Sequence, residues 1–392
     1  MFEVRSAEFP TQQNREFSDW TSKSKSAFGG LFSVFLSGSG ADPVGPRAGG
    51  GWMAKRGRRS PAPPIARPTL EKGDSGPAVA KVQRILGLPA DGDFGPVTDA
   101  GVRGFQGASG ISKDGIVGPQ TWGKLDALKA KMAAGSDGIS DSLAAQIDAV
   151  VTNSGIESFS WPDRGRAPVG YYHGMAKVFA LSMIRYRRGD PALLIMGEAE
   201  TGNASKDALT WYHAEFAAEE MPNDVAGIDT LRHLFVMLIG LGMRESSGNH
   251  WEGRDTSASN TSADTAEAGL FQTSWNIRSC SSTIPPLLTE FWADPNGFRP
   301  SFDRGVSPTA SNLDNFGRGQ GTQYQWLAKF SPAFHALVTG VGTRRLRRHW
   351  GPINRREVDI VGRVDDLLIS VQNLVDANDE SCVRPDPPHR RS

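Results

Sequence analysis

The chain has little of what several classes of protein need. It contains only two cysteines, Cys280 and Cys382, and its 43 Lys and Arg balance its 43 Asp and Glu. Two cysteines are too few for a disulfide scaffold, and no CxxC or Cys/His spacing predicts a zinc site. The two thiols either pair outside the cytoplasm or stay free and buried, and the sequence leaves both alternatives open.

Long apolar runs and an excess of either charge are also missing. The balanced charge gives no global attraction to a polyanion, so nucleic acid is not expected as a partner. The longest apolar run, near residues 236–241, is much shorter than the about 20 residues that cross a bilayer, so no integral membrane segment is expected. Residues 23–36 have the outline of a secretory signal but begin too far into the chain, so no clear signal peptide is present. A disordered leader, or a true start at Met53, explains the same residues.

Composition divides the chain into segments. Its 392 residues predict two or three domains. Residues 38–68 are dominated by Gly, Pro, Ser, Ala and Arg, which cannot bury enough apolar surface to fold. We therefore expect a leader and linker over 1–68, a first domain over 69–128, a polar hinge over 129–144, a second domain over 145–380 and a tail over 381–392.

The first domain contains an internal repeat, because DGDFGPVT at 91–98 is followed by DGIVGPQT at 114–121. Asp-Gly favours a tight turn with positive φ at Gly92 and Gly115. The Gly-Pro pair favours a helix start, with Pro96 or Pro119 in the first turn. The repeat predicts three short helices joined by two equivalent turns.

The segment from LEKGDSGPAV to TWGKL, residues 70–125, resembles the peptidoglycan-binding domain of many cell-wall hydrolases. The resemblance rests on GDSGPAV, on QRxLG, on both DGxxGPxT turns, on Phe105-Gln106 and on Thr121-Trp122. It implies peptidoglycan as the partner and action on the wall outside the cytoplasm. The candidate contacts, which a purely structural role explains equally well, are Asp91, Gly95, Asp114, Gly118 and Trp122.

Apolar periodicity in the second half is helical rather than strand-like. The sequence predicts a mainly α protein, in which a small three-helix bundle precedes a larger α-rich domain with long loops at 249–268 and 293–322. Helical spacing occurs at 143–151, 175–184, 208–216, 228–243, 324–338 and 358–375.

An apolar segment, LRHLFVMLIGLGM at 231–243, ends in Arg-Glu-Ser-Ser-Gly, and AGLFQTSWN follows at 268–276. The pair ESSG plus GLFQ resembles the active-site motif of lytic transglycosylases and goose-type lysozymes. The resemblance implies a lysozyme-like fold, in which Glu245 protonates the glycosidic oxygen between N-acetylmuramic acid and N-acetylglucosamine. The substrate contacts that it implies are Ser246, Gly269, Leu270, Phe271 and Gln272, to which we add Trp275 as a sugar platform.

The chemistry explains why a carboxylic acid is needed at this position. A sugar alkoxide leaves poorly unless it is protonated, and a carboxyl group is protonated near neutral pH only when burial raises its pKa. A solvated Glu at a helix C-terminus is the alternative, although the macrodipole disfavours it there. A lysozyme needs a second carboxylate as a base, whereas a transglycosylase can act with one. Asp255 is the first candidate for that base, followed by Asp264 and Glu267.

Two departures weaken the assignment within the superfamily. Thr273 and Ser274 follow Gln272 where goose-type lysozymes have an acidic residue, and no clear Tyr-Asn-Ala-Gly element is present. The stretch RRLRRHWGPINRREVDI at 344–360 resembles a late element of bacterial lysozyme-like proteins. This likeness implies that His349 and Trp350 lie near the substrate and that arginines meet stem-peptide carboxylates. A solvated basic helix is the alternative.

Other enzyme classes find less support. An amidase or peptidase would use zinc or a Cys-His pair, and neither HExxH nor a clustered His/Cys spacing occurs. Ser246 has no GxSxG turn around it. We expect no cofactor and no metal. A phage or prophage endolysin fits the missing signal, and the alternative function is a non-catalytic peptidoglycan-binding protein. Oligomeric state stays open.

Overall fold

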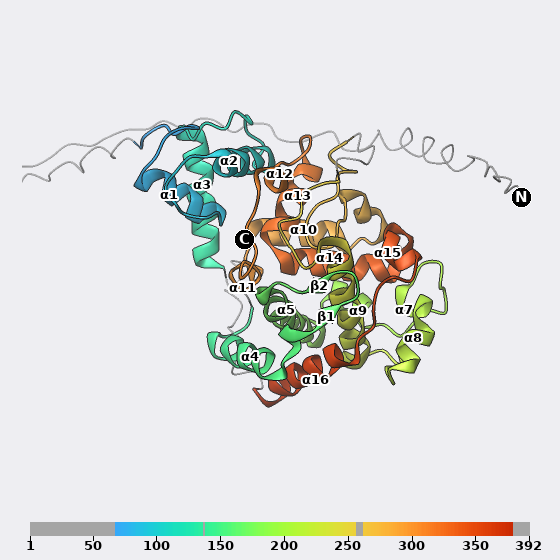
Figure 1. The fold of residues 1–392 in the computed structure, drawn as a ribbon. Coiled ribbons are helices and arrows are strands. Elements are labelled where there is room, and N and C mark those ends of the chain that lie inside the picture. The colour runs from blue at the N-terminus through green and yellow to red at the C-terminus, as the bar shows by residue number, and fades with distance from the viewer. Residues whose placement is uncertain (1–66, 136–137, 256–261, 379–392) are drawn as a thin grey trace, which may run out of the picture. The chain divides into compact units, whose positions relative to one another are not determined.

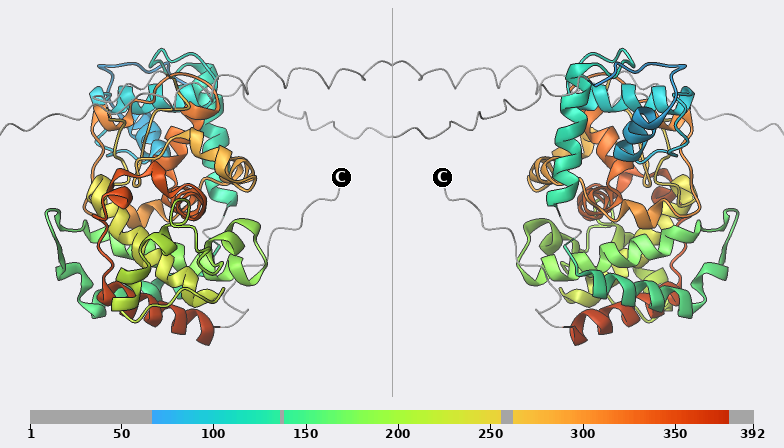
Figure 2. Two further views of the ribbon diagram at one scale, coloured as in Figure 1. Left: turned by 90° about the vertical axis from the view of Figure 1, so that its right-hand side faces the viewer. Right: turned by 90° about the vertical axis from the view of Figure 1, so that its left-hand side faces the viewer.

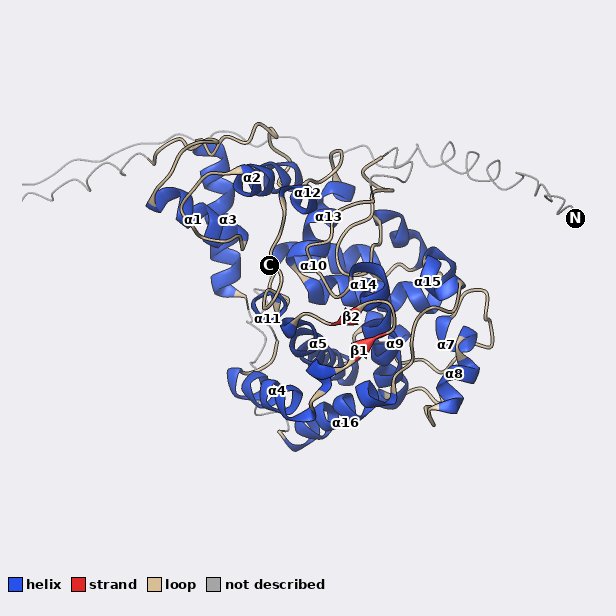
Figure 3. Cartoon of the chain, viewed as in Figure 1, coloured by secondary structure: helices blue, strands red, loops and turns tan. Residues whose placement is uncertain are grey.

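Helices build most of the chain that the computed structural model describes, which comprises residues 67–135, 138–255 and 262–378 (Figures 1 and 3). The mainly α prediction is confirmed. The predicted leader up to residue 66, the predicted tail and Cys382 lie outside the described residues, so the possible Cys280–Cys382 pairing stays a prediction.

The first three helices follow the repeat. They are α1 (Pro77–Leu86), α2 (Pro96–Ala108) and α3 (Pro119–Ala134), each with proline in its first turn. Gly92 and Gly115 have φ of 83° and 75°, which confirms the predicted turns. An isolated antiparallel bridge between Leu70 and Val117 ties the start of the bundle to its second turn.

A buried glutamine holds each of the two turns. The Gln83 side chain donates to Asp91 Oδ1 at 2.6 Å and to Thr98 Oγ1 at 2.9 Å, and its Oε1 accepts from the Gly92 N–H at 2.9 Å. One helix later, Gln106 repeats this pattern in the second turn. It donates to Asp114 at 2.8 Å and to Thr121 at 3.1 Å, and accepts from Gly115 at 2.9 Å. The repeat is therefore a repeated hydrogen-bonded clamp.

We expect the substitution Gln106→Leu to lower the local free energy of unfolding of the bundle by about 2–4 kcal/mol, because it leaves the buried Gly115 N–H without its acceptor and removes the amide donor to Asp114 and Thr121. Hydrogen-exchange protection of the α2 and α3 amides measures this loss. Gln120→Leu, at an exposed position of the same bundle, is the control. Equal protection in the two variants would show that the clamp contributes nothing.

The larger domain begins after the bundle and contains one small hairpin among its helices. In the hairpin, Ser160 pairs with Arg166 and Trp161 with Gly165. The elements are α4 (Asp141–Ser154), η1 (Ile156–Ser158), β1 (Ser160–Trp161), β2 (Gly165–Arg166), α5 (Val169–Arg187), α6 (Pro191–Met196), α7 (Ala208–Trp211), α8 (His213–Ala218), α9 (Ile228–Ser246), η2 (Trp275–Cys280), α10 (Ile284–Ala293), α11 (Arg299–Phe302), α12 (Ala310–Leu313), α13 (Gln320–Phe330), α14 (Pro332–Arg345), η3 (Arg347–His349), α15 (Gly351–Asn354) and α16 (Gly362–Ala377).

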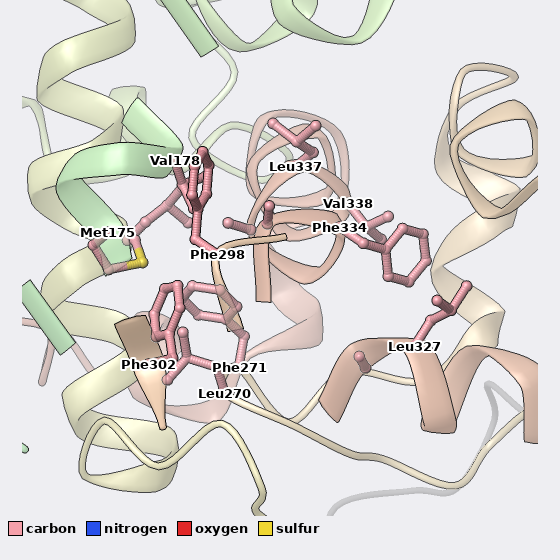
Figure 4. Packing of buried hydrophobic residues seen from close by; sticks show 14 of the residues in the cluster. Met175, Val178, Leu270, Phe271, Phe298, Phe302, Leu327, Phe334, Leu337 and Val338 are labelled. Atoms are coloured by element: carbon pink, nitrogen blue, oxygen red, sulfur yellow. The ribbon is translucent and has the colours of Figure 1, made fainter. Parts of the chain in front are cut away.

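Helix α9 is the centre of this domain. Every residue from Thr230 to Met243 is buried, which is expected of a helix that is apolar on all sides. It packs against α5, α6, α14, α15 and α16. The last of these, at the red end of the colour scale, also lies against α4 and α5 (Figure 2). Figure 4 shows Leu270 and Phe271 beside Phe302 in the same core.

Local breaks differ from the sequence expectations in four places. The helical segment expected over 208–216 is divided into α7 and α8 at Tyr212. The helix expected over 324–338 is two helices, because the chain turns at Ser331 before Pro332. The loop expected at 293–322 contains the short helices α11 and α12. Within the expected hinge, α3 continues to Ala134 and α4 begins at Asp141.

Candidate active site and peptidoglycan-binding domain

The structure brings the ESSG and GLFQ segments into direct contact. Ser246, the last residue of α9, is buried, and its Oγ donates to the Leu270 carbonyl at 2.9 Å and to the Gly242 carbonyl at 3.0 Å. Glu245 precedes it in the last turn and is partly buried. The hydroxyl of Ser246 thus fixes the end of α9, with Glu245, to the turn that begins at Gly269.

The Gly269–Gln272 turn is tight and closely packed. Gly269 has a φ of 75°, and a Cβ there would lie 2.6 Å from the Ala328 carbonyl oxygen, so a side chain does not fit. Gln272 also has a positive φ, and its side chain donates to the Gly269 carbonyl at 2.9 Å. The Gln272 amide therefore has a structural role in holding the turn.

Burial is the main reason why the pKa of Glu245 rises to about 8. The negative charge of Glu267 raises it further, whereas the positive charges of Arg355 and Arg164 lower it. The net effect keeps the carboxyl group protonated at neutral pH, as a general acid requires.

Three further acidic side chains come from the segment between the two motifs, and they are not equivalent. Burial and the charge of Asp255 raise the pKa of Glu267. Asp255 is exposed. Its charge raises the pKa of Glu267, and it is not one of the main contributors to the pKa of Glu245. Asp264 forms an ion pair with Arg278 at 2.8 Å. Of the three carboxylates considered as a base from the sequence, Glu267 raises the pKa of Glu245 most.

Two cations near Glu245 come from distant parts of the chain. Arg164 was not expected there, and Arg355, in the stretch 344–360, was expected to meet stem peptides rather than Glu245. Arg164 lies in the turn of the β1–β2 hairpin, and Arg355 follows α15, where it forms an ion pair with Glu357 at 2.7 Å. The positive charges of both arginines lower the pKa of Glu245, which places them close enough to act on its carboxyl group. Only the fold brings these segments together, so no local signal in the sequence could have identified Arg164 or shown that Arg355 acts on Glu245.

Several residues expected to touch substrate are instead enclosed in the core. The Trp275 side chain is 1 % exposed and packs on Tyr324, with 5.5 Å between ring centroids. Leu270 and Phe271 are fully buried. These buried side chains offer no open surface to a sugar ring, so we do not retain Trp275 as a sugar platform. Leu270 and Phe271 contribute to the core that packs behind the site.

The HWGPI segment has a similar supporting position. The Trp350 ring is buried and its Nε1–H donates to the Phe271 carbonyl at 3.2 Å. Burial lowers the pKa of His349, and its Nε2 is buried with no hydrogen-bond partner in the part of the chain that the structure describes. Trp350 therefore fixes the back of the Gly269–Gln272 turn.

Most arginines of 344–360 are engaged within the protein rather than free for stem peptides. Arg344 and Asp207 form a fully buried ion pair at 2.9 Å. Arg345 pairs with Glu198 at 2.6 Å, and Arg356 pairs with Glu215. The alternative of a solvated basic helix does not describe these residues, because this stretch is divided among α14, η3 and α15.

Comparison with known proteins identifies the bundle. Residues 75–125 match the family described as "Putative peptidoglycan binding domain". The chain carries a peptidoglycan-binding domain. Over 68 residues it is 46% identical to an uncharacterized protein of Kitasatospora aureofaciens, and over 69 residues it is 45% identical to the zinc D-Ala-D-Ala carboxypeptidase of Streptomyces albus G. Each match covers 16% of this chain, and they cover 58% and 27% of those proteins.

The match to the carboxypeptidase lies in the peptidoglycan-binding domain alone. Its zinc chemistry is therefore a property of that protein. In the described part of this chain, no group of three or more His, Cys, Asp or Glu side chains is arranged to hold a metal ion. None of the helices described is long and apolar enough to cross a membrane.

The candidate ligand contacts of the peptidoglycan-binding domain have clear structural partners. The Asp93 N–H and the Gln83 amide hold the pKa of Asp91 below its usual value, and the Ile116 N–H does so for Asp114. Gly95 and Gly118 precede the first residues of α2 and α3. Trp122 is 4 % exposed and donates to the Pro68 carbonyl at 2.9 Å. Their contact with glycan stays a prediction.

We expect the substitution Glu245→Gln to stabilise the protein increasingly as pH rises from about 4.5 to 8. In this range the unfolded Glu is ionised while the folded Glu retains its proton, so the folded state binds more protons and its stability falls with pH. The amide avoids this penalty. At pH 9 the expected gain is about 1–3 kcal/mol, and near pH 4 almost none.

Thermal unfolding of the two proteins at pH 4, 7 and 9 measures this difference. The control is Glu219→Gln, at an exposed position after α8, which should show no such trend. A constant difference across the pH range would contradict the raised pKa of Glu245.

Proposed function

We propose that the helical domain after residue 138 is a lysozyme-like enzyme that cleaves the glycosidic bond between N-acetylmuramic acid and N-acetylglucosamine, on walls to which the peptidoglycan-binding domain brings it. The observation that carries this proposal is the contact between the end of α9, with the partly buried Glu245, and the Gly269–Gln272 turn through the Ser246 hydroxyl. The pKa of about 8 at Glu245 supports it. A buried carboxyl group with a strongly raised pKa is costly to a protein, and such groups concentrate at functional sites.

In the proposed reaction, Glu245 donates its proton to the glycosidic oxygen as the bond to the muramic acid C1 breaks. Protonation converts the departing sugar from an alkoxide into an alcohol, while positive charge develops on the muramic acid ring. Glu245 is then a carboxylate that Arg164 and Arg355 stabilise electrostatically. The same carboxylate can take a proton from the attacking hydroxyl in the second half of the reaction.

The identity of that hydroxyl determines the class of enzyme. If it is the C6 hydroxyl of muramic acid, the product is a 1,6-anhydro sugar and Glu245 is sufficient. If it is water, a second carboxylate is needed as a base. Glu267 has the stronger support for this role, because it is partly buried and its charge acts directly on Glu245, whereas Asp255 acts on Glu267.

Mass analysis of fragments released from purified sacculi tests the proposal. We expect Glu245→Gln to reduce release of soluble muropeptides by at least about 10³-fold, because the amide cannot donate a proton to the leaving oxygen. The activity of the unsubstituted protein should fall as pH rises through about 8, where Glu245 loses its proton. Anhydro ends indicate a transglycosylase and reducing muramic ends a lysozyme.

Two controls separate cleavage from binding. Glu219→Gln should retain full activity. Sedimentation of the Glu245→Gln variant with sacculi should be unchanged, because Glu245 lies outside the peptidoglycan-binding domain. If the unsubstituted protein binds sacculi and releases no glycan fragments, the proposed cleavage is wrong and the chain is a non-catalytic peptidoglycan-binding protein.

A second comparison tests the base. If the enzyme is a lysozyme, Glu267→Gln should lower kcat by about 10²-fold or more, and Asp255→Asn should have the smaller effect. If it is a transglycosylase, neither should lower kcat strongly, although Glu267→Gln should shift the upper limb of the pH profile to lower pH by removing a negative charge near Glu245. A larger loss in Asp255→Asn would assign the base to Asp255.

The site of action follows from the substrate. We propose that the protein works on the cell wall outside the cytoplasm, as a secreted or periplasmic enzyme or as an endolysin released from an infected cell. Fractionation of producing cells, with the protein detected by antibody, distinguishes export by the cell from release at lysis.

A further inference from the structure

The peptidoglycan-binding domain is packed directly on the larger domain along helix α2. Three glycines recur on this helix at intervals of three residues, at Gly101, Gly104 and Gly107. A Cβ on Gly104 would lie 2.7 Å from the Leu313 carbonyl oxygen, and one on Gly107 would meet Lys113 and Thr322. The two domains therefore approach at backbone distance, with no room for larger side chains.

Polar contacts also join the two domains along this interface, which we call the seam. The Asn315 side chain donates to the Gly104 carbonyl at 3.3 Å, and the Lys113 ammonium donates to the Asn315 carbonyl at 2.6 Å. Lys113 also pairs with Asp314 at 3.6 Å. These contacts make the seam a fixed surface to which both domains contribute.

A cavity of about 440 Å³ lies along this seam, within the size range of small-ligand sites. Its wall includes Phe105 of α2, Trp292 of α10 and Trp326 of α13. Trp292 meets Trp326 edge-on at 5.5 Å, and Phe105 lies 5.9 Å from Trp326. The aromatic wall therefore crosses from one domain to the other.

The polar part of the wall is cationic and rich in hydrogen-bonding groups. Lys124 and Lys131 of α3 line the cavity, and none of its lining residues in the described part of the chain is Asp or Glu. Lys131 is held against Trp292, because it donates to that residue's carbonyl at 2.6 Å and lies 5.2 Å from its ring centroid. Burial, and the like charge of Lys124, lower the pKa of Lys131. An anion placed between the two lysines would relieve this repulsion.

Gln320 and Gln323 of α13 provide the matching polar groups from the larger domain. Both line the cavity. Neither side chain has a hydrogen-bond partner among the described residues, unlike Gln83 and Gln106 in the bundle. Amides that can donate and accept suit the hydroxyl and acetamido groups of an amino sugar, and aromatic rings suit the CH faces of its ring.

We infer that the seam cavity is a composite binding site for an acidic amino sugar of the wall, a peptidoglycan fragment whose carboxylate meets Lys124 and Lys131 while its sugar ring contacts Trp292 and the two glutamines. The carboxylate belongs either to the lactyl group of muramic acid or to the stem peptide. The inference rests on the peptidoglycan-binding domain and not on the proposed cleavage, because Glu245 does not line this cavity.

The test uses the full chain with Glu245→Gln, so that no ligand is cut, and with 5-fluorotryptophan incorporated. The ¹⁹F signal of Trp292, assigned with Trp292→Phe, reports on the cavity whatever binds elsewhere. The ligands are a muramic-acid disaccharide with a tetrapeptide stem, the same disaccharide without the stem, and neutral chitobiose. We expect at least one acidic ligand to shift the Trp292 signal, and chitobiose to bind about tenfold more weakly or not at all.

Variants on the two sides of the seam decide whether the site is composite. Lys124→Glu on α3 and Gln323→Leu on α13 should each raise the Kd from the Trp292 signal by about tenfold or more. Lys129→Glu, exposed on the same helix but outside the cavity, and Gln120→Leu are the matched controls and should not change it.

Three results would overturn the inference. They are a Trp292 signal that none of the ligands moves, chitobiose binding as tightly as the acidic disaccharides, and a Kd that Gln323→Leu leaves unchanged. The last would place any binding on the peptidoglycan-binding domain alone. The acidic ligand that binds more tightly identifies the source of the carboxylate. Loss of glycan cleavage, measured separately on sacculi, bears only on the proposed function.

Discussion

The chemistry of the candidate site depends on one constraint, which is that Glu245 lies in the last turn of a helix that is buried on every side. An exposed carboxyl group at a helix C-terminus would simply ionise in water. At the end of α9, hydration is reduced by the surrounding core, and the negative end of the helix dipole acts against ionisation as well. Glu267 acts in the same direction, and Arg164 and Arg355 offset only part of the effect. The burial of α9 thus has two effects. It stabilises the protein enough to offset the cost of a partly buried carboxyl group, and it keeps that group protonated by raising its pKa.

Close packing around α9 also positions the facing turn. A Cβ on Gly242 would lie 2.3 Å from the Tyr171 hydroxyl and 3.3 Å from the Phe271 ring. That hydroxyl donates to the Ile239 carbonyl at 2.7 Å, so α5 is held against the last turns of α9. Ser246 completes the arrangement through the Leu270 carbonyl. Small residues near the end of α9 therefore let the Gly269–Gln272 turn approach closely enough for its backbone to be bonded by a serine.

Local signals in the sequence were sufficient for the peptidoglycan-binding domain and for the two facing motifs. Gly-Pro helix starts, Asp-Gly turns and an apolar run are short-range features, and the structure has the helices and turns that they predict. Pro332 was an equally local sign of the break between α13 and α14 that the periodicity concealed. Electrostatic partners are different, because Arg164, Arg355 and Glu245 lie far apart in the chain and meet only through tertiary packing. For the same reason, aromatic composition could not show that Trp275 faces the core.

The contact along α2 changes what the linker between the domains can do. A polar segment with glycines suggests a flexible tether, which would leave the peptidoglycan-binding domain and the larger domain free to sample many orientations. The segment between α3 and α4 is much shorter than the expected hinge, Gly104 holds α2 close to the backbone of the larger domain, and Gly107 lies against the Thr322 side chain. Bulkier residues at these positions would separate the helices, so the glycines serve packing between domains rather than turns. For the proposed cleavage this has a direct consequence. A glycan strand held by the peptidoglycan-binding domain would reach Glu245 along a fixed path, so the spacing of sugars along the strand, and not the length of a tether, would determine which bond is cut.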